Sequence, residues 1–365
     1  MPKLLTKLIF ISPVLLTIVA VNYFVDPSHV FDDDAYANEI AGYMLDNYNI
    51  ANYKNMDDRL LLKHYFAGTN QLFDNIILGS SRSMTIGEEY FKGKTFLNCS
   101  VTGCGLGDLL AIYRFMQSNN KIPRYLLISV DPWFFNKNNQ YVVKESAYYD
   151  YFKILDDIGL SKPFASAKIR IIKFKLLVYG LLDLDYFNTS LKKLYLHGVS
   201  RDYFIPLKGI VSATSIRMHD GSRREPIKQY IPINVRSIAL EEAHAPYGFW
   251  NYKDINEDYK MIFEKFALYA QRQGASISLI LMPYHPSAYT SMSNNPSFKI
   301  INDVEMYIRN FAQSNQIKVF GSYNPYNLAM DETLFQDGNH LSAQGIQKFM
   351  QITRLSELYD LTSGN

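Results

Sequence analysis

Residues 75–81 read Asn-Ile-Ile-Leu-Gly-Ser-Ser and contain the pattern that decides the fold class. A short apolar run that ends in glycine and serine is typical of a buried strand leading into a turn. The pattern returns at Tyr125–Val130, which Asp-Pro follows, and at Ser276–Met282, which proline follows. Strands that read as continuous apolar runs are covered on both faces, so these segments predict a parallel sheet between two layers of helices.

Other segments of the chain continue this alternation of strands and helices. Thr95–Asn98 and Ile317–Phe320 are two further strand candidates. Apolar residues with helical spacing cover Asp108–Met116, Ile255–Gln273, Lys299–Ser314 and Ser342–Leu358. We therefore predict an α/β fold, a three-layer αβα sandwich around a central parallel sheet. Ligands bind beyond the carboxyl ends of such strands, so chemistry is expected at that edge.

The composition favours a large globular core and gives no electrostatic reason to expect a nucleic-acid partner. Of the 365 residues 48% are hydrophobic, and 37 Lys+Arg against 35 Asp+Glu leave a formal net charge of +2. Aromatic residues reach 15%, which suits glycan contact and a packed core equally well. The histidines lack the close partners of a metal site, so we expect neither a metal nor another cofactor.

The amino terminus has the pattern of a membrane anchor. Lys3 and Lys7 flank the run Leu8–Phe24, which contains no charge and is just long enough to span a bilayer. The positive-inside rule then leaves the rest of the chain outside the cytoplasm. A cleaved signal peptide is the alternative, but Val19–Tyr23 is a poor cleavage site. We therefore predict a single amino-terminal transmembrane helix within residues 1–30 and an extracytoplasmic domain.

The remainder of the chain divides into a predicted stalk and a predicted catalytic domain. Residues 31–70 are polar, aromatic and weakly periodic, which favours a stalk or linker that ends in a short helix. The domain covers residues 71–358, with an insertion or lid at about 137–245 that includes the helix-like apolar run Ile169–Leu182. The two cysteines, Cys99 and Cys104, are consistent with a disulfide or with two buried thiols.

Ser81 is the candidate nucleophile. A serine hydroxyl needs a base to take its proton, and a sharp turn that exposes its oxygen beside backbone N–H groups. A strand, a glycine and then a serine before a helix at Met84–Phe91 would supply that turn. The alternative is that Ser81 only caps the helix, which is a common role for serine.

Asp337 and His340 are the candidate partners of Ser81. They lie in a loop just before the last predicted helix. An aspartate three residues before a histidine orients the imidazole through Nδ1 and leaves Nε2 to face the serine. A turn with a surface histidine would explain Asp-x-x-His equally well, but its combination with strand-Gly-Ser-Ser is less frequent.

These segments resemble the motif blocks of the SGNH (GDSL) hydrolase superfamily, which has a flavodoxin-like fold. Gly79-Ser80-Ser81 is similar to its first block, with Ser81 as nucleophile, and Asp337 and His340 match its last block. Asn98 and Gly103 have the spacing of its second block, which implies that the N–H groups of Ser81 and Gly103 form the oxyanion hole. The third block, Gly-x-Asn-Asp, is absent, and Asp131 stands at that strand end. An ionised aspartate cannot donate a hydrogen bond as that asparagine does.

The Gly-Ser-Ser block, the single anchor and Trp133 after Asp131-Pro132 resemble one branch of this superfamily. Its members are membrane-anchored proteins that acylate or deacylate surface polymers, including alginate O-acetyltransferases and the D-alanyl-lipoteichoic acid transfer protein. The resemblance implies serine-dependent acyl transfer to an extracytoplasmic polysaccharide or cell-wall polymer, at the membrane and with a multi-pass membrane acyltransferase as partner. The alternatives are an esterase that removes acyl groups from such a glycan, and a non-catalytic glycan-binding or scaffold protein of an export complex.

Five further residues near strand ends are candidates for substrate contact. They are Arg82, Asn98, Asp131, Trp133 and His285. His285 follows a strand and would face the same crevice as the other motifs, although a loop histidine without such a role is equally consistent with the pattern. Arg82 either holds an anionic polymer or lies in solvent at the start of a helix.

Overall fold

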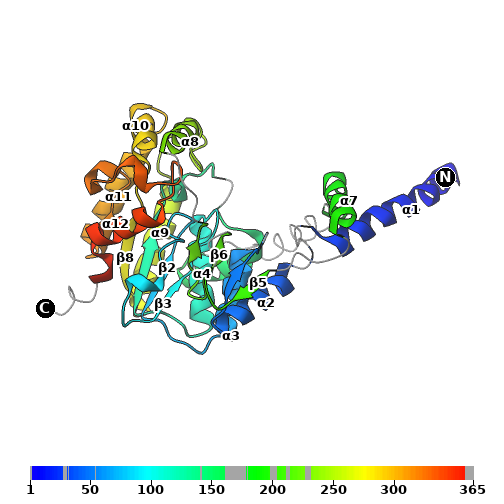
Figure 1. The fold of residues 1–365 in the computed structure, drawn as a ribbon, viewed down its shortest axis with the longest axis horizontal. Helices are drawn as coiled ribbons and strands as arrows, with labels where there is room; N and C mark the ends of the chain where they lie inside the picture. Colours follow the sequence, from blue (N-terminus) through cyan, green and yellow to red (C-terminus); the bar gives the residue numbers. More distant parts are fainter. Residues whose placement is uncertain are drawn as a thin grey trace.

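A five-stranded parallel sheet forms the centre of the computed structural model (Figure 1). The structure describes residues 2–27, 31, 33–53, 55–139, 142–160, 178, 180–197, 204–210, 214–226 and 232–357. The strand order is β3-β2-β4-β8-β9, with every neighbouring pair parallel. These strands are β2 (Asn75–Leu78), β3 (Phe96–Asn98), β4 (Tyr125–Ser129), β8 (Ser276–Leu281) and β9 (Lys318–Gly321). Numbered along the chain, this is the 2-1-3-4-5 order of doubly wound, flavodoxin-like sheets.

Both faces of the sheet are covered, as the apolar runs predict. Ile76 and Leu78 of β2 pack into one hydrophobic cluster, and Ile77 between them packs into a second cluster on the other face. The first cluster includes residues of α3 (Asp58–Gly68), α4 (Leu106–Ser118), α9 (Glu257–Arg272) and α11 (Ile300–Ser314), and the second includes residues of α12 (Ala343–Thr353). The sequence-based prediction of an α/β sandwich with a central parallel sheet is therefore confirmed.

The helices around this sheet lie close to their predicted positions. They are α4 (Leu106–Ser118), α9 (Glu257–Arg272), α11 (Ile300–Ser314) and α12 (Ala343–Thr353). A further helix, α10 (Pro286–Asn294), follows β8 and was not expected from the sequence. Helix α9 illustrates why they form. Asn256 caps its first turn by accepting a hydrogen bond from the N–H of Tyr259, and its buried face is apolar. After it, Gly274 takes a φ of +97°, a conformation that favours glycine.

The segment predicted as a stalk belongs instead to the body of the domain. It forms α2 (Asp33–Leu45), β1 (Asn49–Ala51) and α3 (Asp58–Gly68). Ile40 of α2 and Leu62 of α3 are buried in the same cluster as one face of the sheet. Arg59 of α3 forms a buried ion pair of 2.8 Å with Asp108 of α4. The sequence did not indicate this packing, because charged residues of α3 are buried by pairing with residues that are distant in the chain.

Helix α1 (Pro2–Val25) occupies the position of the predicted membrane anchor, and Figure 1 shows it extending away from the body of the molecule. Helix α7 (Leu184–His197) lies beside it. The side chain of Asn22 donates hydrogen bonds to the backbone oxygens of Gly180, Leu181 and Asp183. Across the residues that the structure describes, no helix combines the length and apolar character needed to span a bilayer.

The described parts of the predicted insertion are distributed over the domain. Helix α5 (Tyr148–Asp157) packs on α4, and α8 (Pro232–His244) packs on α10. β5 (Ile205–Leu207), β6 (Ile216–Arg217) and β7 (Arg223–Arg224) join β1 in a small antiparallel sheet of order β5-β1-β6-β7. Most of the apolar run Ile169–Leu182 lies outside the described residues.

Short 3₁₀ turns complete the described structure. They are η1 (Glu88–Tyr90), η2 (Pro132–Phe135), η3 (Glu145–Ala147), η4 (Pro325–Leu328), η5 (Glu332–Leu334) and η6 (Leu355–Glu357). Of these, η2 follows β4 directly, so its residues lie at the carboxyl edge of the sheet.

Candidate active site

Ser81 lies in a tight turn just beyond the carboxyl end of β2. Gly79 is required before it, because a Cβ there would lie 2.6 Å from the Cβ of Ser129 on the neighbouring strand. Consecutive turns follow, in which the N–H of Ser83 bonds to the oxygen of Ser80 at 3.1 Å. They replace the helix predicted at Met84–Phe91. Ser80 and Ser83 are buried, whereas Ser81 is partly exposed, so Ser81 is the serine of this turn that a substrate can reach.

Ser81, His340 and Asp337 form a continuous hydrogen-bonded chain. The Oγ of Ser81 lies 2.9 Å from Nε2 of His340. Nδ1 of the same ring lies 2.9 Å from Oδ2 of Asp337. The first two residues are 259 positions apart in the sequence, so this contact exists only because the sheet brings the two loops to one edge. The arrangement is that of a nucleophile, a base and a group that orients the base.

The Asp337 carboxylate is held in its charged form. Burial acts to raise the pKa of this carboxyl, but the hydrogen bond and charge of His340 and two backbone N–H groups outweigh it, so the pKa lies below its usual value. Those N–H groups belong to Asn339 and His340, each 2.8 Å from Oδ1. A charged Asp337 accepts the N–H at Nδ1 of His340, which leaves Nε2 as the acceptor that a serine needs.

Arg82 connects the Ser81 turn with the ends of β4 and β8 and with the loop of His340. Its side chain is 1% exposed. It donates hydrogen bonds to Oδ1 of Asp131 at 3.0 Å, to the backbone oxygen of Met282 at 2.5 Å and to that of Asn339 at 3.2 Å. The guanidinium also stacks 4.0 Å from the ring centre of Tyr284. Because Arg82 follows Ser81 directly, these contacts fix the distance between Ser81 and the loop of His340.

Glu242 also stabilises the loop that carries Asp337 and His340. It lies on α8, in the region predicted to be an insertion. Its Oε2 accepts hydrogen bonds from the backbone N–H of Gly338 at 3.0 Å and from the side chain of Asn339 at 3.3 Å. Burial, together with the charge of Asp337, raises the pKa of Glu242. No sequence motif marked this residue, because α8 is distant in the chain from Asp337.

The loop of Gly103 lies beside the Ser81 turn. The N–H of Val101 bonds to the oxygen of Gly79 at 2.9 Å, which aligns the two segments. Gly103 takes a φ of +60°, and Arg59 of α3 holds the loop by bonding to the oxygen of Thr102 at 2.7 Å. Among the described residues, none accepts a hydrogen bond from the N–H of Ser81 or of Gly103. The role of these two N–H groups as donors to an oxyanion stays a prediction.

The five residues expected to contact substrate are all buried. Arg82, Asn98, Asp131, Trp133 and His285 are each no more than 4% exposed. Asn98 is a structural residue, because its Nδ2 donates to the oxygens of Ser83 and Ile86 at 2.9 and 2.8 Å and so shapes the Ser81 turn. The sequence pattern located these residues at the correct edge of the sheet but carried no information on their burial.

Trp133 and His285 also have structural partners. The indole N–H of Trp133 donates to the oxygen of Cys104 at 2.9 Å. His285 caps α10, where its Nδ1 accepts from the N–H of Ser287, and its own N–H bonds to the oxygen of Gly338 at 3.0 Å. Burial lowers the pKa of His285. The two residues therefore support the site from below its surface.

Asp131 occupies the strand end where the resembling superfamily has an asparagine. It is fully buried, and its Oδ1 accepts from Arg82, while Oδ2 has no hydrogen-bond partner among the described residues. Burial raises the pKa of this carboxyl, and the Arg82 guanidinium opposes the rise. Paired in this way, Asp131 anchors Arg82 and does not supply the amide donor of the usual third block.

The cysteines next to the Gly103 loop are free thiols. Cys99 and Cys104 are both buried, and burial raises the pKa of each. In the described part of the chain, no three His, Cys, Asp or Glu side chains gather as a metal site would require. Comparison with known proteins adds no assignment, because neither a family model nor a curated protein matches this chain.

Proposed function

We propose that this protein transfers an acyl group to a polysaccharide or cell-wall polymer outside the cytoplasm, through a covalent intermediate on Ser81. The observation that carries the proposal is the hydrogen-bonded chain from Ser81 through His340 to Asp337, with both contacts at 2.9 Å. A serine in a turn, an imidazole that can take its proton and a carboxylate that orients the imidazole are the groups that acyl transfer needs.

The reaction has two steps, acylation of Ser81 by the donor and transfer of the acyl group to the acceptor. Oγ of Ser81 attacks the carbonyl carbon of the acyl donor while Nε2 of His340 takes the hydroxyl proton. The oxyanion accepts hydrogen bonds from the N–H groups of Ser81 and Gly103, and His340 returns the proton to the leaving oxygen. A sugar hydroxyl then attacks the acyl-serine, His340 takes its proton, and Ser81 leaves with that proton restored.

Membership of the SGNH superfamily is part of the proposal. It is supported by the order of the motifs and by the 2-1-3-4-5 strand order, which places Ser81 after the first strand of the sheet. The departure at the third block, where Asp131 pairs with Arg82, means that the side-chain oxyanion donor of that superfamily is missing here. The backbone donors therefore carry a larger share of the stabilisation.

An extracytoplasmic location at the membrane is also proposed, on the evidence of Lys3, Lys7 and the uncharged run between Leu8 and Phe24. That location separates the enzyme from cytosolic acyl donors, so a multi-pass membrane acyltransferase is the expected supplier. A phosphatase fused after residue 40 should be active in cells, and the full chain should sediment with membranes. An inactive fusion, or recovery of a chain lacking residues 1–20 in the supernatant, would contradict this location.

Labelling by a serine-directed phosphonate tests the nucleophile. The protein should be labelled at Ser81, and His340→Ala should slow labelling by about 10³-fold, because the hydroxyl loses its base. Ser118→Ala is the matched control, since Ser118 is an exposed serine on α4 and its loss should not change the rate. Labelling at Ser80, or an unchanged rate in His340→Ala, would remove the basis of the proposal.

Ester hydrolysis is the second candidate, and the exposure of the site favours it. The side chain of His340 is 30% exposed, so water can reach an acyl group on Ser81. An oligosaccharide acceptor added to the purified enzyme separates the two activities. A transferase should divert the acyl group to the sugar, whereas an esterase should release the same amount of free acid as before.

Deletion of the protein and complementation with Ser81→Ala distinguish the proposed enzyme from a non-catalytic scaffold. Deleting the protein should lower acylation of a surface glycan without stopping its synthesis, and Ser81→Ala should fail to restore it. Full restoration by Ser81→Ala would show that the chain acts in an export complex without chemistry of its own.

A further inference from the structure

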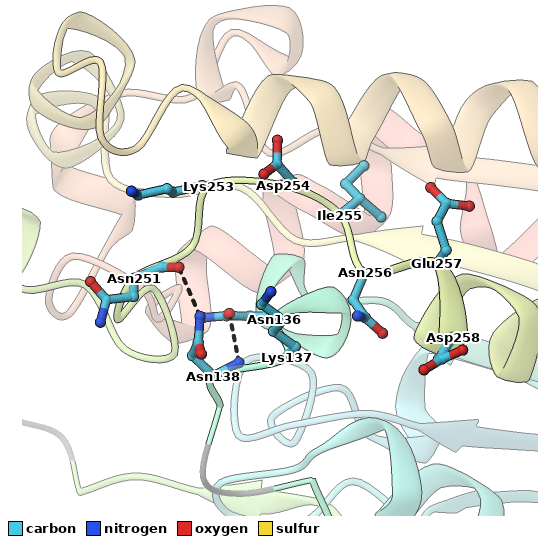
Figure 2. Close-up of a pocket in the computed structure, with 10 residues that line it drawn as sticks. All are labelled: Asn136, Lys137, Asn138, Asn251, Lys253, Asp254, Ile255, Asn256, Glu257 and Asp258. Carbon is cyan, nitrogen blue, oxygen red and sulfur yellow. Dashed lines mark hydrogen bonds between the residues drawn. The ribbon is translucent and has the colours of Figure 1, made fainter.

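A polar pocket of about 650 Å³ is lined by ten residues, none of which belongs to the Ser81 turn. Figure 2 shows these residues. Residues 136–138, which follow η2, form one wall. Asn251 and residues 253–258, which lead into α9, form the other wall. The first lining residue, Asn136, lies five positions after Asp131, which pairs with Arg82 next to Ser81.

The two walls are joined by hydrogen bonds, so the pocket is preformed. Asn136 is buried, and its Nδ2 donates to the backbone oxygens of Gly248 at 2.8 Å and Trp250 at 3.0 Å. The side chain of Asn138 donates to the backbone oxygen of Asn251 at 2.9 Å, and Figure 2 shows this bond across the pocket. A site whose walls are already fixed loses little conformational entropy when a ligand binds.

The lining suits a neutral ligand that is rich in hydroxyl groups. Four of its ten residues are asparagines, and only Ile255 is aliphatic. The amide of Asn136 is used within the protein, whereas the Asn251 amide and the Oδ1 of Asn138 lie at the lining with hydrogen-bonding capacity for a ligand. Two lysines stand against three carboxylates, which leaves a formal charge of −1. One of those carboxylates, Glu257, is paired with Lys260 at 2.9 Å. The charge of the lining is therefore too small to favour a polyanion or a strongly cationic ligand.

The segment 247–251 connects this pocket with the loop of Gly103. The hydroxyl of Tyr247 lies 3.3 Å from the position that a Cβ on Gly103 would take. The Tyr247 ring packs edge-on against Trp133 at 5.1 Å, and Gly248 lies against the same indole. Two residues further along, Trp250 is 75% exposed and borders the pocket through its backbone. An exposed indole has an apolar face and an N–H donor, a combination suited to contact with a sugar.

We propose that this pocket is a subsite for a neutral oligosaccharide, which it holds while a neighbouring sugar unit reaches Ser81 along Tyr247 and Trp250. The inference rests on the proposed acyl transfer and names the class of its acceptor: an uncharged glycan, bound through hydroxyl groups. It assigns binding roles to Asn138, Asn251 and Trp250.

Intrinsic fluorescence tests binding without turnover, because the chain has two tryptophans and only Trp250 is exposed. The full chain carrying Ser81→Ala is titrated with a neutral hexose hexasaccharide and with a uronate hexasaccharide. We expect a saturable emission change with the neutral sugar only, and its loss in Trp250→Phe. Asn138→Ala and Asn251→Ala should each raise Kd about tenfold, since each removes a hydrogen-bonding amide. Asn310→Ala, an exposed asparagine on α11, is the matched control.

Several results would overturn the subsite. They are the absence of any emission change, a preference for the uronate, and equal binding by the Asn138 and Asn251 variants. Loss of a membrane-protein partner from those two variants, with sugar binding intact, would reassign the pocket to protein docking. Binding of the sugar without phosphonate labelling at Ser81 would contradict the acyl-transfer proposal. Labelling at Ser81 without binding of the sugar would contradict only the subsite.

Discussion

At the scale of single residues, the buried Arg82 connects segments that are far apart in the sequence. Its guanidinium bonds to Asp131 after β4, to Met282 after β8 and to Asn339 in the loop of His340. A buried ion pair is weak evidence for net stability, but removing one partner leaves an uncompensated charge. Arg82 is therefore a positioning residue for the candidate site, and it acts through the loops that it joins.

Arg82→Met should reduce both stability and activity. The isolated Asp131 carboxyl should lower the free energy of unfolding by about 3–5 kcal/mol. Adding Asp131→Leu should recover part of this loss, because no buried charge remains. Turnover should stay about 10²-fold below the parent in both variants, since misplacement of a catalytic group by about 1 Å has that effect. Denaturant unfolding and kcat measured side by side check this, and full activity in the double variant would show that Arg82 does not position the site.

At the scale of elements, two helices outside the motif blocks support the site. Helix α8 contributes Glu242, which accepts hydrogen bonds from the loop of Asp337 and His340. Helix α3 contributes Arg59, which bonds to the oxygen of Thr102 beside Gly103 and pairs with Asp108 of α4. The geometry around Ser81 therefore depends on elements from both the predicted insertion and the predicted stalk.

Glu242→Ala should lower kcat by about tenfold, because the buried N–H of Gly338 loses its acceptor and the loop beside it shifts. Glu242→Gln keeps an oxygen acceptor and should restore most of the activity. Glu241→Ala, an exposed neighbour on the same helix, is the control. Steady-state kinetics should show the change in kcat with little change in KM. Equal activity of the alanine and parent proteins would mean that α8 does not support the loop.

Helix α2 should make stability depend on pH through Asp33. Burial, followed by the charge of Asp57, raises the pKa of Asp33 to about 6. A raised carboxyl pKa favours the protonated form in the folded state. Its contribution to stability is therefore complete below about pH 4, the unfolded value, and is lost as pH rises through 6.

Asp33→Asn removes this ionisation. The variant should melt about 2 °C higher than the parent at pH 8 and at the same temperature at pH 4, a small gain because Asp33 is only half-buried. Thermal melts across this pH range check the prediction. A gain that is constant with pH would attribute the effect to something other than ionisation.

At the scale of the whole molecule, α2, β1 and α3 form one body with the sheet. Ile40, Leu62 and Phe66 are buried with the helices that cover one face of the sheet. Helix α1 instead extends away from this body beside α7 (Figure 1). The boundary of the folded unit therefore lies before α2 and not at residue 71, where the sequence analysis expected it.

Truncation tests that boundary. A chain that begins at residue 31 should fold, unfold cooperatively and react with the phosphonate at Ser81. A chain that begins at residue 71 should not, because it exposes the apolar surface under α2 and α3 and leaves the Asp108 carboxylate without Arg59. Near-ultraviolet circular dichroism and labelling rates compare the two. Cooperative unfolding of the shorter chain would restore the interpretation of residues 31–70 as a stalk.

The sequence by itself determined the features that depend on neighbouring residues. Strands β2, β4 and β8 were recognisable because buried parallel strands are apolar throughout, and the helices by their apolar spacing. Asp337 and His340 lie three residues apart, so their hydrogen bond is local and can be expected from the motif. Ser81 was identified by its position after a strand and a glycine, a local pattern as well.

The tertiary structure decided which distant residues meet and which side chains are removed from water. Arg82 and Asn339 are 257 positions apart, and Glu242 and Gly338 are 96 apart. Periodicity reports the face of an element that is apolar, but not which other element covers it. The burial of a polar side chain depends on partners that distant segments bring to it, which is why Asn98, Trp133 and His285 were expected at a surface and are found beneath it.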